Sequence, residues 1–206
     1  MKYSTIIVIA GIAIIVGAVF LWANQRDFEI RNYPSQGETI IAFGDSLVKG
    51  IGAQEGNDFV SVLSAQIGEP IENFGRSGDT TERALGRIDT VLERNPKVVL
   101  VLLGGNDYIL RTSKEKVFAN LGMIIEAIQE RGAIVILLGV RGGILKDGYK
   151  KDFENLAREY KTAYVPNIID DIIGNPEFMF DSIHPNDKGN QIIADRIYPI
   201  LKELIE

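Results

Sequence analysis

Cysteine is absent from this sequence of 206 residues, and histidine and tryptophan each occur only once. Without cysteine, the chain forms neither a disulfide framework nor a thiolate zinc site. Cysteine usage therefore does not indicate whether the protein's compartment is oxidising or reducing. A basic excess is also missing: the formal net charge is −6, which argues against a nucleic-acid-binding surface. The apolar content of 46% and the lack of a heptad repeat exclude the disordered, collagen-like and coiled-coil classes.

One long hydrophobic run is present near the N-terminus, where Ile6–Ala23 contains 18 residues without a charge. As a helix this segment would be about 27 Å long, close to the ~30 Å hydrocarbon core of a bilayer. Cleavable signal peptides have a shorter apolar core of about 7–15 residues and a small residue three positions before the cut, where this chain has Leu21. The sequence therefore predicts residues 1–23 to be an uncleaved transmembrane anchor, with the following domain outside the cytoplasm. A cleaved signal peptide, which would make the protein secreted or periplasmic, and a buried core helix stay open.

After the hydrophobic run, residues 24–38 are polar and contain a Pro/Gly break, which predicts a linker. Residues 39–206 are enough for one domain that buries its own core. Short apolar runs predict five strands, and the continuously apolar ones are expected to be buried on both faces. The predicted strands are Thr39–Phe43, Ile71–Phe74, Val98–Leu103, Ile134–Val140 and Tyr164–Ile168.

Amphipathic helical patterns alternate with these strands. One pattern follows DTTE at 79–82, which resembles a capping box, and ends at NP at 95–96. A second follows TSKE at 112–115 and ends before Gly132, and a third is C-terminal with Asn186 as its expected N-cap. The alternation predicts an α/β fold with a parallel sheet and helices on both sides of it.

Four polar motifs lie after the predicted strands or before the last helix. They are GDSL at 44–47, SGDTT at 77–81, GGND at 104–107 and DSIHP at 181–185. Because chemistry in open parallel sheets lies beyond the carboxyl ends of the strands, we expect the four motifs to converge on one edge.

The residue types in these motifs fit serine hydrolysis. That reaction needs a hydroxyl, an imidazole base, a carboxylate on the other ring nitrogen and donors for the oxyanion. His184 is the only histidine, and Asp181 lies close enough in the same loop to reach it. Ser46 follows the first strand and is a candidate nucleophile. Ser77, flanked by glycine, is its rival, although GRSG at 75–78 is not the Gly-x-Ser-x-Gly elbow.

Together the four motifs resemble the SGNH, or GDSL, hydrolase superfamily from the first strand to the C-terminus. Within it, they are most similar to the bacterial multifunctional thioesterase/lysophospholipase/arylesterase group. The resemblance implies a flavodoxin-like, three-layer α/β/α sandwich with about five parallel strands, and neither a metal nor an organic cofactor. It implies Ser46 as nucleophile, His184 as general base and Asp181 as the residue that orients His184. The oxyanion would be bound by the Ser46 and Gly78 amides and the Asn106 side chain.

The resemblance also implies an ester or thioester hydrolase that acts on small molecules, including lipids, through an acyl-enzyme. Apolar residues near two strand ends are candidates for an acyl groove, with ordinary loop packing as the alternative. They are Tyr108, Ile109, Leu110, Ile144 and Leu145. A carbohydrate or peptidoglycan O-acetylesterase with the same catalytic set is the alternative enzyme, and a membrane-tethered, non-catalytic binding domain is the alternative from another class. We expect a monomer that contacts the membrane through its N-terminal helix and has no nucleic-acid partner.

Overall fold

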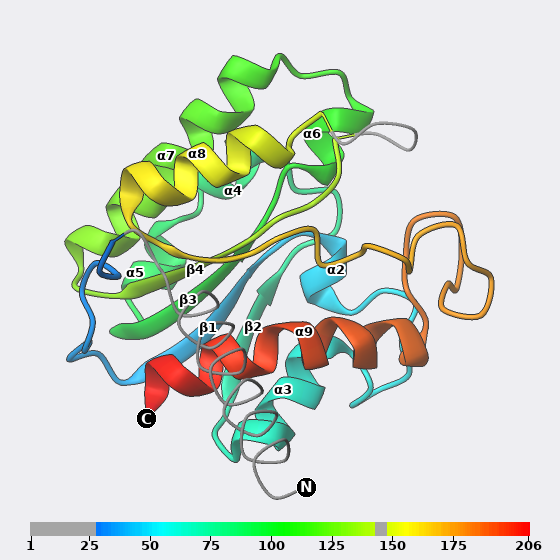
Figure 1. The fold of residues 1–206 in the computed structure, drawn as a ribbon, viewed down its shortest axis with the longest axis horizontal. Coiled ribbons are helices and arrows are strands. Elements are labelled where there is room, and N and C mark those ends of the chain that lie inside the picture. Colours follow the sequence, from blue (N-terminus) through cyan, green and yellow to red (C-terminus); the bar gives the residue numbers. More distant parts are fainter. Residues whose placement is uncertain (1–27, 143–147) are drawn as a thin grey trace, which may run out of the picture.

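The computed structural model describes residues 28–142 and 148–206, whose arrangement is drawn in Figure 1. Five parallel strands form one sheet in the order β2-β1-β3-β4-β5, in agreement with the predicted parallel α/β fold. This is the strand order of flavodoxin-like sheets. The strands are β1 (Thr39–Gly44), β2 (Ile71–Gly75), β3 (Pro96–Leu102), β4 (Ile134–Leu138) and β5 (Ala163–Val165).

Helices cover both faces of this sheet. In the described chain they are α2 (Ser46–Lys49), α3 (Phe59–Ile67), α4 (Thr81–Leu85), α5 (Asp89–Leu92), α6 (Gly105–Ile109), α7 (Lys114–Glu130), α8 (Lys150–Tyr160) and α9 (Asp187–Ile205). The pair α3 and α9 packs on one face, and α7 packs with α4 and α8 on the other (Figure 1). The short helices α2 and α6 directly follow β1 and β3, so both lie at the carboxyl edge of the sheet.

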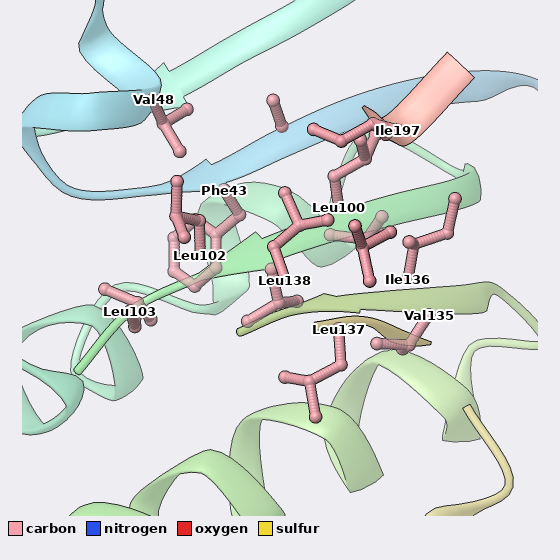
Figure 2. Packing of buried hydrophobic residues seen from close by; sticks show 14 of the residues in the cluster. Phe43, Val48, Leu100, Leu102, Leu103, Val135, Ile136, Leu137, Leu138 and Ile197 are labelled. Atoms are coloured by element: carbon pink, nitrogen blue, oxygen red, sulfur yellow. The ribbon is translucent and has the colours of Figure 1, made fainter. Parts of the chain in front are cut away.

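β3 and β4 form the centre of the core, as their continuous apolar runs predict. Every residue of β4 is buried, and in β3 only Lys97 is partly exposed. Successive side chains of a strand point to opposite faces. Figure 2 shows Ile136 on the side of Ile197 from α9 and Leu137 on the opposite side. Burial of both faces specifies the strand register, and the register determines where the strand ends and their loops lie.

The helix predicted after the SGDTT motif is interrupted in the structure. α4 ends before Gly86, a residue with low helix propensity, and α5 begins three residues later. The N-cap of α4 is Thr80 and not Asp79, and the carboxylate of Asp79 pairs instead with the guanidinium of Arg87 at 2.6 Å. The helix predicted after TSKE is present as α7, and Ser113 of that motif caps it.

The start of β3 and the end of β5 differ from the predicted boundaries, and a proline lies at each of them. β3 begins at Pro96, which the sequence pattern assigns to the end of the preceding helix. Proline fits the first position of a strand, where no ladder donor is required. β5 ends before Pro166, although the predicted strand continues to Ile168. β4 also ends two residues earlier than predicted, at Leu138.

The hydrophobic run predicted to be a membrane anchor, Ile6–Ala23, lies outside the described residues. Within residues 28–142 and 148–206, none of the helices is both long enough and apolar enough to span a bilayer. The anchor and its alternative, a cleaved signal peptide, therefore stay predictions.

The polar segment predicted as a linker is described from Phe28 onward, and this part lies against the domain. Ile30 is buried in the core, and the backbone N–H of Arg31 donates to the carbonyl of Lys161 at 3.0 Å. The side chain of Asn32 donates to the carbonyl of Gln129 in the last turn of α7 at 2.8 Å and to that of Ala133, just before β4, at 2.9 Å. These contacts attach the residues before β1 to the helix layer formed by α7 and α8.

Candidate active site

The first motif lies in the turn that leaves β1. Gly44 ends the strand, and a β-carbon there would lie 2.3 Å from the carbonyl oxygen of Leu102, so a larger residue does not fit. Asp45 caps α2 by accepting the backbone N–H of Leu47 at 3.0 Å. Ser46 is therefore the first residue of α2, and it lies at the carboxyl edge of the sheet.

The fourth motif lies in the loop that leads into α9. Oδ1 of Asp181 accepts the backbone N–H groups of Ile183 and His184, both at 2.8 Å. Asn186 caps α9, as predicted, by accepting the N–H of Gly189 at 3.2 Å. These local hydrogen bonds hold the Asp181 carboxylate and the His184 imidazole side by side just before the helix.

The two motifs meet in space although many residues separate them in the chain. Nε2 of His184 lies 3.0 Å from Oγ of Ser46, and its Nδ1 lies 2.8 Å from Oδ2 of Asp181. Gly52 permits this approach, because its backbone has φ +96° and a β-carbon there would lie 2.7 Å from the carbonyl oxygen of Pro185. The arrangement fits the tautomer in which Nδ1–H donates to the carboxylate and Nε2 accepts from the hydroxyl.

The carboxylate of Asp181 is held in its ionised form. The hydrogen bond with His184 is the largest cause, followed by the backbone N–H groups of Ile183 and His184, and together they lower the pKa of Asp181 to about 2. An ionised carboxylate at this position favours a proton on Nδ1 and leaves Nε2 as the hydrogen-bond acceptor. Asp181 is therefore ionised at neutral pH, with its charge beside Nδ1 of His184.

A pocket of about 320 Å³ opens beside the hydroxyl and the imidazole. It is lined by Ser46, Ile51, Ser77, Gly78, Asn106, Ile183 and His184. Residues of all four predicted motifs therefore meet at one place, as expected from the topology. Ser77, the rival nucleophile, lies in the same pocket, but the hydrogen bond to His184 comes from Ser46.

Asn106 is oriented by two oxygen atoms. Its Nδ2 donates to the backbone carbonyl of Asp79 at 2.9 Å, and it lies 3.3 Å from Oδ2 of Asp45. Asp45 is 4% exposed, and burial raises its pKa to about 7 against the lowering effect of its bond to Leu47. Gly78 has φ +80°, a backbone conformation that glycine adopts without strain. The turn and the α6 terminus thus place Gly78 and the Asn106 amide in the pocket that contains Ser46.

Comparison with known proteins agrees with this geometry. Residues 42–192 match the GDSL-like Lipase/Acylhydrolase family, and the match includes all four motifs. The chain belongs to this family. Esterase TesA of Pseudomonas aeruginosa is 27% identical over 180 residues, which cover 82% of this chain and 90% of TesA. Thioesterase 1/protease 1/lysophospholipase L1 of Escherichia coli is 27% identical over 177 residues, which cover 82% of this chain and 85% of that protein.

The fold is also similar to that of a solved esterase structure. The psychrotrophic esterase EstA from Pseudoalteromonas sp., in a form inhibited by monoethylphosphonate, is 27% identical and has a TM-score of 0.73. The similarity covers 80% of this chain and 97% of that chain. The predicted resemblance to the GDSL superfamily is confirmed, and the protein is a hydrolase of that family.

In this GDSL-family chain, the residues predicted to form an acyl groove are only partly described. Tyr108 and Ile109 line a second pocket, of about 550 Å³, and not the one beside Ser46. Leu110 is 61% exposed and lines neither pocket, while Ile144 and Leu145 lie outside the described residues. The assignment of these five residues to an acyl groove therefore stays a prediction.

Two residues that line the GDSL site and one that binds the strand ends behind it carry no signal in the sequence. Ile51 and Ile183 line the pocket, but an isoleucine in a loop carries no signal that separates a pocket wall from ordinary packing. Arg87 donates to the carbonyl groups of Gly44 and Phe74, at the ends of β1 and β2. In the sequence it is only one arginine within a predicted helix, and its contacts depend on the break between α4 and α5.

Proposed function

We propose that this protein hydrolyses carboxylic esters and thioesters through an acyl-enzyme on Ser46. The observation that carries the proposal is the chain of contacts from Ser46 Oγ through His184 to Asp181, at 3.0 and 2.8 Å. It supplies a nucleophile, a base and an orienting carboxylate in the relation that serine hydrolysis requires. The pocket beside this chain of contacts provides the space for the substrate's carbonyl group.

In the first half of the reaction, Oγ of Ser46 attacks the carbonyl carbon while Nε2 of His184 takes the hydroxyl proton. A tetrahedral intermediate forms, and its negative charge lies on the former carbonyl oxygen. When the intermediate collapses, His184 gives the proton to the leaving alkoxide or thiolate, and the acyl group stays on Ser46. Asp181 stabilises the transient imidazolium and remains ionised throughout.

In the second half, a water molecule replaces the departed alcohol or thiol. His184 takes one proton from this water, the hydroxide attacks the acyl carbon, and a second oxyanion forms. The proton then returns to Oγ of Ser46 as the carboxylic acid leaves. The enzyme regains its starting protonation state without a metal or an organic cofactor entering any step.

The oxyanion is stabilised by three donors in our proposal: the Ser46 and Gly78 backbone N–H groups and Nδ2 of Asn106. Asn106 keeps one hydrogen on the carbonyl of Asp79, and its other hydrogen faces Oδ2 of Asp45 at the longer distance of 3.3 Å. The substrate oxygen replaces Asp45 as the acceptor of that second hydrogen. Donors aimed at the developing charge are each worth roughly 2.7–4 kcal/mol of barrier lowering.

The substrate's acyl group is expected to contact Ile51 and Ile183, because they are the apolar residues that flank Ser46 in the pocket. A volume of about 320 Å³ lies near the lower end of the roughly 300–1,000 Å³ typical of small-molecule sites. We therefore expect short to medium acyl chains to give higher kcat/KM than a palmitoyl chain.

An ester panel tests the proposed function. It contains p-nitrophenyl esters from acetyl to palmitoyl, matched acyl-CoA thioesters and an O-acetylated oligosaccharide, each assayed with the wild type and with Ser46→Ala. The proposal expects turnover of simple esters and thioesters that Ser46→Ala abolishes. Turnover of the O-acetylated sugar alone would favour the O-acetylesterase alternative, and no turnover of any member would favour a non-catalytic binding domain.

We also infer that the enzyme is held at a membrane by Ile6–Ala23, with residues 39–206 outside the cytoplasm. The support for this is the 18-residue uncharged run itself, preceded by Lys2. The full chain is then expected to fractionate with membranes and to resist extraction by high salt. A native protein whose N-terminus maps to about residue 24 would instead identify a cleaved signal peptide.

A further inference from the structure

Arg87 lies in the break between α4 and α5 and binds three separate segments of the chain. Its Nε donates to Oδ2 of Asp79 at 2.6 Å. Its Nη2 donates to the carbonyl oxygens of Gly44 and Phe74, at 3.0 and 2.9 Å. The guanidinium carbon lies 4.5 Å from the ring centroid of Phe43, so the aromatic face covers the cation.

Each of these three segments leads directly into the candidate active site. Gly44 comes two residues before Ser46, and Phe74 lies near the end of β2, just before the turn that contains Gly78. Asp79 follows Gly78, and its backbone carbonyl accepts the hydrogen bond from the Asn106 side chain. Arg87 therefore contacts the backbone of the strand ends before Ser46 and Gly78 directly. It is connected to the Asn106 amide only through Asp79, whose carboxylate it binds.

We propose that Arg87 is the positioning residue of the oxyanion hole. It holds the turns after β1 and β2 at a constant separation and, through Asp79, determines where the Asn106 amide points. This inference rests on the proposed function, because it assigns Arg87 to the donors that the proposed reaction uses. Arg87 does not line the pocket, so it acts on the reaction only through these other residues.

The chemistry of the contacts explains why an arginine is needed. A planar guanidinium presents donors in a fixed fork, whereas the ammonium group of lysine is a point charge on a flexible stem. Here the fork serves one carboxylate and two backbone carbonyls at the same time. Asp79 is only 3% exposed, so a substitution that removes the guanidinium leaves a nearly buried carboxylate without its ionic partner. Lysine would restore the charge but not the three directed hydrogen bonds.

The test compares Arg87→Lys and Arg87→Ala with matched substitutions at Arg94, whose guanidinium pairs with Glu72 at 2.8 Å but is 52% exposed. A displacement of about 1 Å in a catalytic array costs roughly 100-fold in rate. We therefore expect kcat for a p-nitrophenyl ester to fall roughly 100-fold in both Arg87 variants, with KM within about threefold of the wild type. The Arg94 variants should retain wild-type kcat.

Added guanidinium chloride provides a readout that a purely structural role would not move. At non-denaturing concentrations it should raise kcat of Arg87→Ala in a saturable manner, while sodium chloride at equal ionic strength should not. Wild-type kcat within about threefold in folded Arg87→Lys, or a loss expressed only in KM, would overturn the proposal. If both Arg87 variants are unfolded where the Arg94 variants are folded, Arg87 serves the fold alone and the proposal is equally overturned.

The proposed function is tested independently in the wild type. A fluorophosphonate that fails to modify wild-type Ser46 would refute the reaction itself, whatever the Arg87 variants do. Modification of wild-type Ser46, together with wild-type kcat in Arg87→Lys, would leave the reaction standing and refute only the positioning role.

Discussion

Replacing Asp181 by asparagine tests the role of the carboxylate without enlarging or emptying its site. Asparagine retains an oxygen that accepts the two backbone N–H groups now bound by Oδ1, each at 2.8 Å. The amide nitrogen, however, would face Nδ1 of His184, where the carboxylate oxygen Oδ2 now lies at 2.8 Å. Because an amide nitrogen only donates, Nδ1 has to become an acceptor, and the ring proton moves to Nε2. The imidazole then presents a proton to Ser46 and no longer accepts one.

The corresponding change in a serine-protease triad lowers kcat about 10⁴-fold by the same tautomer effect. We expect a loss of that order in Asp181→Asn, with KM nearly unchanged and the circular-dichroism spectrum of the wild type. Steady-state hydrolysis of p-nitrophenyl butyrate measures the loss.

Asp171→Asn is the matched control for the Asp181 substitution. Asp171 is exposed, and its backbone has φ +57°, a conformation that asparagine also adopts. Asp171→Asn should therefore keep wild-type kcat. A kcat for Asp181→Asn within tenfold of the wild type would refute the assignment of Asp181 as the residue that sets the tautomer.

Three further outcomes are expected. Asn106→Ala should lower kcat by roughly 10²–10³ with little change in KM, because it removes one oxyanion donor; a large rise in KM with normal kcat would speak against that role. At acid pH, kcat/KM should fall with the uptake of a single proton, because only a neutral His184 can take the hydroxyl proton of Ser46. The pKa of Asp181 is about 2, which is too low for Asp181 to cause this fall. The pKa of Asp45 is raised to about 7, so Asp45→Asn is the control: an acid limb that persists in this variant does not come from Asp45. Because burial raises the pKa of Asp45 from 3.8 to about 7, protonated Asp45 contributes stability that is fully present below pH 3.8 and is lost as pH rises through about 7. The wild-type Tm should therefore decline between these pH values relative to Asp45→Asn. Finally, a chain starting at Phe28 should fold and keep full activity on water-soluble esters, whereas one starting at Thr39 should melt lower, since it loses the burial of Ile30, worth about 2 kcal/mol.

The sheet and the convergence of the motifs are predictable from the sequence because they rest on simple regularities. Continuous apolar runs specify β3 and β4, and parallel strands bring their carboxyl ends to one edge. A single histidine leaves one candidate for an imidazole base. The resemblance to the GDSL superfamily then supplies the roles of Ser46 and Asn106, which the residues taken singly leave open.

Other features depend on side-chain contacts between distant segments, and no local pattern reports them. Thr80 caps α4, while the carboxylate of Asp79 binds Arg87, eight residues later in the chain. Likewise, Gly52 is needed because the His184 loop packs on it from the other end of the chain. Helix propensity and capping rules describe neighbours in sequence, so they do not register such contacts.

The proposed reaction depends above all on Ser46, activated by His184, as the nucleophile. The most direct measurement is to incubate the enzyme with a fluorophosphonate, digest it and locate the adduct by mass spectrometry. We expect a single adduct on Ser46, unchanged in Ser77→Ala, absent from Ser46→Ala and formed far more slowly in His184→Ala. An adduct on Ser77, which lines the same pocket, or undiminished labelling of Ser46→Ala would contradict it.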